Sequence, residues 1–166
     1  MKIIEQADNL FALSEIKAAL RIEHSAEDDV ISRYSDAALD WFEKVTDHYL
    51  RYTTLEQVFV RSPVELPSRP FVEIVSAKDE DDADVAVTTF ESYGGCTVCT
   101  WDTLDDVTLR WKAGCEKRKD IPAMSAAAIR VLVGDLYVYR NLETPGAHSQ
   151  RFVSAGVFLG DARGAV

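Results

Sequence analysis

The stretch that decides the fold runs from Leu13 to Leu50 and is LSEIKAALRIEHSAEDDVISRYSDAALDWFEKVTDHYL. Ser14 and Ser25 are of a type preferred at the N-cap of a helix. Three acidic residues follow Ser25 closely, where the helix dipole favours negative charge. Apolar residues then recur at steps of three and four up to Val45, which is the pattern of an amphipathic helix. The stretch therefore predicts a pair of helices, at about residues 14–22 and 26–45.

The middle of the chain has the composition of strands. The segment TTLEQVFV at residues 53–60 is rich in β-branched and aromatic side chains, and residues 71–77 alternate in polarity. Prolines at positions 63, 67 and 70 separate these two segments, and further short apolar runs follow at residues 85–93, 96–101 and 106–111. The pattern predicts a small antiparallel sheet of about four strands within residues 53–111.

The last third returns to a helical pattern, expected at about residues 122–142, with Asp120 as N-cap and Pro122 near the first helical position. The predicted fold class is α+β and mainly helical. It has an N-terminal helix pair, a long C-terminal helix, a small antiparallel β-sheet inserted between them and an extended C-terminal tail. We expect a single domain over residues 1–146 and a docking tail over residues 147–166.

The tail is rich in Gly, Ala and Ser and also carries large apolar side chains. Such side chains are not normally left in water, so the segment either folds back on its own domain or docks on another chain. Its glycines and its lack of strong helix signals favour an extended segment that gains order on binding to another chain. They are Phe152, Val153, Val157, Phe158 and Leu159.

The composition excludes several classes of protein. The chain has 166 residues, of which 47% are hydrophobic, so it can form a core and is not disordered as a whole. Its formal net charge of -10 disfavours binding to DNA phosphates or to anionic membranes. The most apolar stretch, residues 126–139, contains Arg130 and Asp135 and is too short to span a bilayer. The start has no signal-peptide pattern, and three cysteines fit free thiols in a reducing cytoplasm.

Charge is unevenly distributed. The second predicted helix is acidic on its polar side, and a basic cluster precedes the last helix, a combination that suits head-to-tail self-association. Two unrelated solvated surfaces are the alternative. The candidate interface or channel residues are Asp28, Asp29, Asp36, Asp40, Arg110, Lys112, Lys117, Arg118 and Lys119.

One motif supports an alternative function that depends on chemistry at a site. This motif is Cys96-Thr97-Val98-Cys99, with Cys115 further along the chain. A C-x-x-C pair can belong to a zinc or redox site, but zinc needs four ligands and the sequence has no second pair. The alternative function is a small cytoplasmic metal- or thiol-dependent protein. No catalytic motif is evident, so we expect no enzyme activity, no cofactor and no metal. A sugar-binding sheet built on Trp101 and Trp111 is a weaker option.

Several short phrases follow one another along the chain. They are Leu20-Arg21-Ile22, then Glu27-Asp28-Asp29-Val30-Ile31, the proline-rich LPSRPFVEIVSAKDEDD at residues 66–82, and Trp111, Ala113 and Gly114 followed by Ile121-Pro122. The pattern continues with Ala128, Ile129, Leu132, Val133, Leu136, Tyr137 and Arg140. In order and spacing these phrases resemble the head–tail connector (adaptor) proteins of tailed bacteriophages, and the similarity covers about residues 13–143.

The resemblance implies a structural virion protein at the head–tail interface, assembled while in the host cytoplasm. Such proteins form a ring, usually of twelve copies, beneath the portal. They extend the DNA channel without binding DNA specifically and join the head to a downstream neck or tail-completion protein. The C-terminal segment of relatives reaches the portal, so the resemblance gives the apolar tail a partner.

Overall fold

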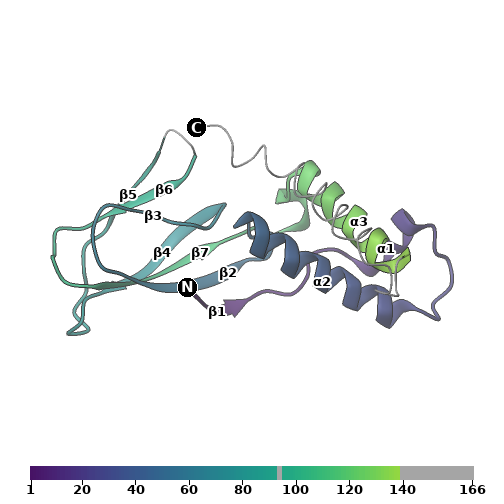
Figure 1. Ribbon diagram of the computed structural model, residues 1–166, viewed down its shortest axis with the longest axis horizontal. Helices are drawn as coiled ribbons and strands as arrows, with labels where there is room; N and C mark the ends of the chain where they lie inside the picture. The colour runs from purple at the N-terminus through teal and green to yellow at the C-terminus, as the bar shows by residue number, and fades with distance from the viewer. Residues whose placement is uncertain (93–94, 139–166) are drawn as a thin grey trace, which may run out of the picture. The chain divides into compact units, whose positions relative to one another are not determined.

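The computed structural model describes residues 1–92 and 95–138. The chain is α+β, as predicted, and divides into two compact units, each built from separated segments. Unit 1 comprises Met1–Asp8 and Asp47–Glu116 and contains the strands. The described part of unit 2 comprises residues 9–46 and 117–138 and contains the helices. Figure 1 shows these elements in chain order.

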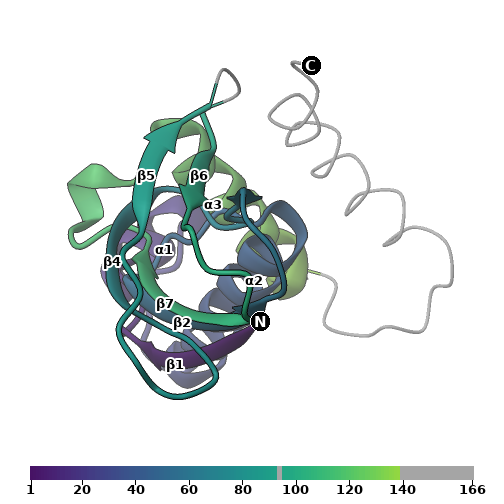
Figure 2. The same cartoon turned by 90° about the vertical axis from the view of Figure 1, so that its left-hand side faces the viewer.

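Unit 1 holds two small antiparallel sheets. The larger has the strand order β1-β2-β7-β4, made of Lys2–Gln6, Thr53–Phe59, Val107–Ala113 and Phe71–Lys78. The smaller has the order β3-β6-β5, made of Val64–Glu65, Thr97–Thr100 and Thr88–Glu91. Figure 2 shows β5 and β6 side by side, and the two strands pair antiparallel.

The central strand β7 explains why the larger sheet has one buried face. Its sequence VTLRWKA alternates so that Val107, Leu109, Trp111 and Ala113 are buried while the residues between them are half-buried. Trp111 is fully enclosed and its Nε1 donates a 2.6 Å hydrogen bond to the buried Ser68 hydroxyl. Strands that alternate in this way place apolar side chains on a single face, where they form the core of unit 1.

The described part of unit 2 is built from three α-helices that pack against one another: α1 (Leu13–Leu20), α2 (Asp28–Thr46) and α3 (Ala123–Val138). A short 3-10 turn, η1 (Arg118–Asp120), precedes α3. Each helix buries an apolar side and contributes to the core of unit 2, with Ile16 from α1, Leu39 from α2 and Ile129 from α3 all at most 1% exposed.

The three predicted helices are confirmed, with shifted ends. α1 begins one residue before Ser14, and Ala12 takes the N-cap position, where its carbonyl accepts hydrogen bonds from the Glu15 and Ile16 amides. Asp120 is not the N-cap of α3, because it closes η1 and the Pro122 carbonyl accepts the first helical bond, from Ala126. The predicted helix end at residue 142, the boundary at 146 and the tail at 147–166 lie outside the described residues.

The sheet differs from the prediction in two respects. The predicted single sheet of about four strands is instead two sheets, and β1 was not expected from the sequence. β1 pairs with β2 at an edge, and its register shifts between Ile3 and Glu5. The irregularity and the adjacent Ile3 and Ile4 remove the alternation that would have indicated a strand.

Candidate interaction surfaces

The outer side of α2 carries the predicted acidic candidates. Asp29, Asp36 and Asp40 are exposed, whereas Asp28 is half-buried and its carboxylate lies 2.6 Å from the Lys17 ammonium. Asp36 accepts a 2.9 Å hydrogen bond from the Asn9 amide. The helix tolerates Asp28 and Asp29 in its first turn because the helix dipole favours negative charge there. α2 therefore presents an acidic, solvent-facing side.

The five basic candidates belong to different units. Arg110 and Lys112 lie on the same side of β7 in unit 1, and both face acids on neighbouring strands. Arg110 donates two hydrogen bonds, of 2.6 and 3.1 Å, to Glu56, and Lys112 donates one of 2.8 Å to Glu73. These two charges therefore take part in cross-strand ion pairs within the larger sheet.

Of the three basic candidates in unit 2, Lys117 and Lys119 are exposed and Arg118 is held inside its own unit. The Arg118 guanidinium donates to both carboxylate oxygens of Glu15, at 3.0 and 2.5 Å, and lies 4.5 Å from the centre of the Phe11 ring. The hydrogen bonds from Arg118 lower the pKa of the Glu15 carboxyl below its ordinary value. Arg118 thus ties η1 to α1, whereas Lys117 and Lys119 are available to solvent.

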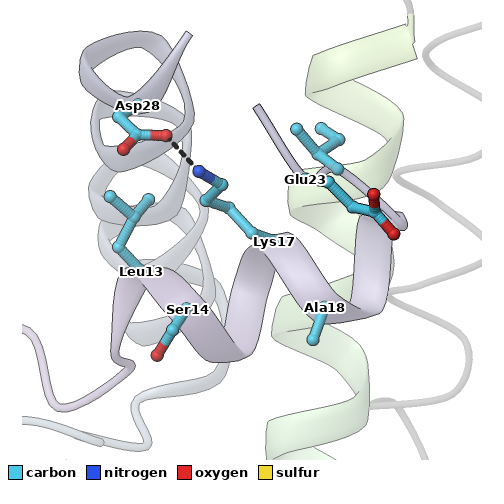
Figure 3. Close-up of a pocket in the computed structure, with 7 residues that line it drawn as sticks. Leu13, Ser14, Lys17, Ala18, Glu23 and Asp28 are labelled. Atoms are coloured by element: carbon cyan, nitrogen blue, oxygen red, sulfur yellow. Dashed lines mark hydrogen bonds and ion pairs between the residues drawn. The ribbon is translucent and has the colours of Figure 1, made fainter. Parts of the chain in front are cut away.

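A pocket of about 440 Å³ lies beside α1 in unit 2 (Figure 3). Its lining is mostly small or apolar, and Lys17 points toward Asp28 across one wall. The Lys17–Asp28 pair already satisfies both charges, and the lining residues include no nucleophile paired with a base. The lining residues are Leu13, Ser14, Lys17, Ala18, Ile22, Glu23 and Asp28.

The thiols of the C-x-x-C segment are core groups. Cys96, Cys99 and Cys115 are buried, and none of the three forms a disulfide. Burial raises the pKa of the Cys99 thiol to about 11, and burial also raises the pKa of the Cys96 thiol, which accepts a hydrogen bond from Arg69. A protonated, enclosed thiol is a poor nucleophile and a poor metal ligand. Within residues 1–92 and 95–138, no group of three or more His, Cys, Asp or Glu side chains could hold a metal ion.

In the part of the chain that the structure covers, no helix has the length and apolar character needed to cross a membrane. Trp101 and Trp111, considered above as a sugar platform, are 5% and 0% exposed and belong to the core of unit 1. A feature that the sequence did not single out is the exposed side of α3, where Met124, Val131 and Val138 are each more than half exposed.

The fold is shared with proteins of gene transfer agent (GTA) particles. One chain, from "Neck of empty GTA particle computed with C6 symmetry", has a TM-score of 0.71 at 17% identity and covers 89% of each chain. A second, from "Virion of native gene transfer agent (GTA) particle", has a TM-score of 0.69 at 18% identity, with 97% of this chain and 94% of that chain covered. A third, from "Neck of native GTA particle computed with C12 symmetry", has a TM-score of 0.67 at 16% identity, with 98% and 94% covered.

No curated protein matches the sequence. A family model described as "Phage gp6-like head-tail connector protein" matches residues 11–155, which is most of the chain. The match includes α1, α2, strands β2 to β7, α3 and part of the predicted tail, whereas β1 lies outside it. It confirms the resemblance drawn from the order of the sequence phrases. The chain belongs to the phage gp6-like family of head–tail connector proteins.

Proposed function

We propose that this connector works as one subunit of a ring, of twelve copies, at the neck of a tailed phage or phage-like particle. The ring lies under the portal, continues the DNA channel and presents its other side to a downstream neck or tail-completion protein. The observation that carries the proposal is the family match over residues 11–155, and the fold shared with a neck chain solved with C12 symmetry supports it.

The distribution of charge supports a head-to-tail ring. In such a ring each copy meets its neighbour through two different surfaces. The exposed acids of α2, Asp29, Asp36 and Asp40, form one charged surface, and the exposed Lys117 and Lys119 form another of opposite sign. Opposite charges at an interface chiefly set orientation and the rate of encounter. Arg118, Arg110 and Lys112 are less suited to this role because each already pairs with an acid of its own unit.

The negative charge of the chain also suits passage of DNA. Proteins that hold DNA neutralise its phosphates with Lys and Arg, and every such contact would retard a sliding duplex. With a net charge of -10, the chain repels phosphate on balance. We therefore propose that DNA moves through the ring without specific binding.

The portal contact is assigned in this proposal to the tail side chains Phe152, Val153, Val157, Phe158 and Leu159. Their large apolar surface, in a segment otherwise rich in small residues, is typical of a segment that docks on a partner. A chain that ends after Gly146 should therefore lose the portal while keeping the fold of both units.

The test is to mix the purified protein with the portal protein encoded in the same genome and to record native mass spectra. We expect a ring of about twelve copies bound to the portal for the complete chain, and no portal-bound ring for the chain that ends at Gly146. A complete chain that stays monomeric in the presence of the portal contradicts the proposal. Equal binding by the shortened chain contradicts the role of the tail alone.

A further inference from the structure

α3 is apolar on two opposite sides. One side packs within unit 2, where Ala126, Ile129, Leu132 and Val133 are at most 1% exposed. The other side carries Met124, Val131 and Val138, which are 65%, 59% and 68% exposed, and these residues recur every seven positions. Because α-helical residues seven apart lie on the same side, they form a line roughly 20 Å long together with the exposed Ala127. We call Met124, Ala127, Val131 and Val138 the α3 stripe.

The α3 stripe lacks the charged side chains that a solvent-facing side of a helix normally carries. The outer side of α2, in the same unit, does carry them, with Asp29, Arg33, Asp36 and Asp40 at exposed positions. A helix that is apolar on all sides is normally buried on all sides. The small residues Ala127 and Ala128 also allow another element to approach the backbone of α3 closely.

Charge identifies the kind of partner that fits the stripe. α2 contains five acidic and two basic residues, whereas α3 contains one of each. Two copies of a chain with a net charge of -10 repel each other, and the repulsion is low only where the facing surfaces are close to neutral or opposite in sign. Nucleic acid would select a basic surface, which α3 is not. We infer that the α3 stripe packs against a second copy of this chain, an inference that rests on the proposed ring.

A head-to-tail contact requires a second apolar surface of different shape on the neighbouring copy. Unit 1 has one at β4, an edge strand of the larger sheet. The register of β4 shifts between Phe71 and Glu73 and again between Ile74 and Ser76, and the intervening Val72 and Val75 are 41% and 45% exposed. The chain thus carries both kinds of surface that a closed ring needs, whereas stripe-to-stripe contact would give only a dimer.

The test introduces a charge into the centre of the stripe with Val131→Asp. Val60→Asp is the matched control, because Val60 is 70% exposed, lies outside the surfaces proposed for the ring and undergoes the same change. Each purified variant is mixed with the portal protein, and native mass spectrometry measures the fraction of subunits in rings. We expect Val131→Asp to reduce that fraction at least tenfold, Val60→Asp to assemble like the unchanged chain, and Val131→Ile to retain assembly. Both aspartate variants should unfold in urea at similar midpoints.

A photo-crosslinking amino acid at position 131 then identifies what covers the stripe. A crosslinked product of twice the chain mass supports the inference, and a product with the portal protein overturns it. Rings formed equally by Val131→Asp and Val60→Asp also overturn it while leaving the proposed function intact. A large loss of stability in the Val131→Asp monomer alone would show that the chain covers the stripe by itself, which again overturns the inference. If the unchanged chain forms no ring, the proposed function fails first.

Discussion

Replacing Arg118 by alanine should destabilise unit 2 by about 1–2 kcal/mol. The Arg118 guanidinium makes hydrogen bonds of 2.5 and 3.0 Å to Glu15 and lies 4.5 Å from the centre of the Phe11 ring. Hydrogen bonds to charged groups contribute about 1.5–3 kcal/mol when well buried, and an exposed cation–π contact about 0.5–1 kcal/mol. The side chains of Arg118 and Glu15 are 32% and 31% exposed, so water screens the pair and the lower part of this range applies.

The free energy of unfolding in urea, followed by circular dichroism at 222 nm, measures this loss, since the described α-helices all belong to unit 2. Lys117→Ala is the control, because it removes the same charge from the adjacent, exposed position and should cost no more than about 0.5 kcal/mol. If the two variants differ by less than about 0.5 kcal/mol, the ion pair is not stabilising, and Arg118 becomes available as an interface residue.

The same pair has a defined pH dependence. Arg118 lowers the pKa of Glu15 in the folded protein below the ordinary 4.5, so the unfolded chain takes up a proton first as the pH falls. The stabilising contribution is therefore complete above pH 4.5 and declines as the pH falls from there through the lowered pKa. The stability advantage of the unchanged chain over Glu15→Gln should follow this course in urea titrations at several pH values, and an advantage that does not change with pH would contradict the reasoning.

Three further predictions concern unit 1. Ser68→Ala leaves the buried Trp111 Nε1 without its acceptor and should lower the free energy of unfolding in urea by about 1–3 kcal/mol. The control Ser76→Ala, on β4, should lower it less, and equal losses would contradict the role of this hydrogen bond. Gly114→Ala should lower the melting temperature more than Gly95→Ala. Both glycines have positive φ, but only at Gly114 would an added Cβ meet the Arg51 carbonyl. Calorimetry of the two variants tests this order. Cys99, buried and with a pKa of about 11, should resist iodoacetamide at pH 7 until the chain unfolds, and rapid labelling detected by mass spectrometry would refute its enclosure.

The helices could be predicted from the sequence because the residues that indicate each helix lie close together along the chain. Steps of three and four between apolar residues locate α2 to within two residues at its start and one at its end. Helix ends were less accurate: Ser14 and Asp120 are of the preferred N-cap type, but Ala12 and Pro122 supply the first helical carbonyls. The number of sheets was not predictable, since β3 has only two residues and β1 lacks alternation.

For the charged surfaces, the sequence is limited in a different way. The sequence shows how many charges lie close together along the chain, but not which of them are paired by the fold. Arg118 appeared to belong to a free basic cluster, yet its partner Glu15 is 103 positions away. The apolar side of α3 was obscured for a similar reason, since a helix with apolar residues all round does not reveal which side the rest of the unit covers.

The order in which the chain is synthesised has a consequence for this architecture. α1 and α2 leave the ribosome before any of Asp47–Glu116, and α3 follows only after that segment is complete. The apolar sides of α1 and α2 that pack against α3 therefore stay uncovered until the strand-forming segment has been made. A nascent chain stopped at Glu116 holds all the described strands but lacks α3, so the helical unit can be completed only at the end of synthesis.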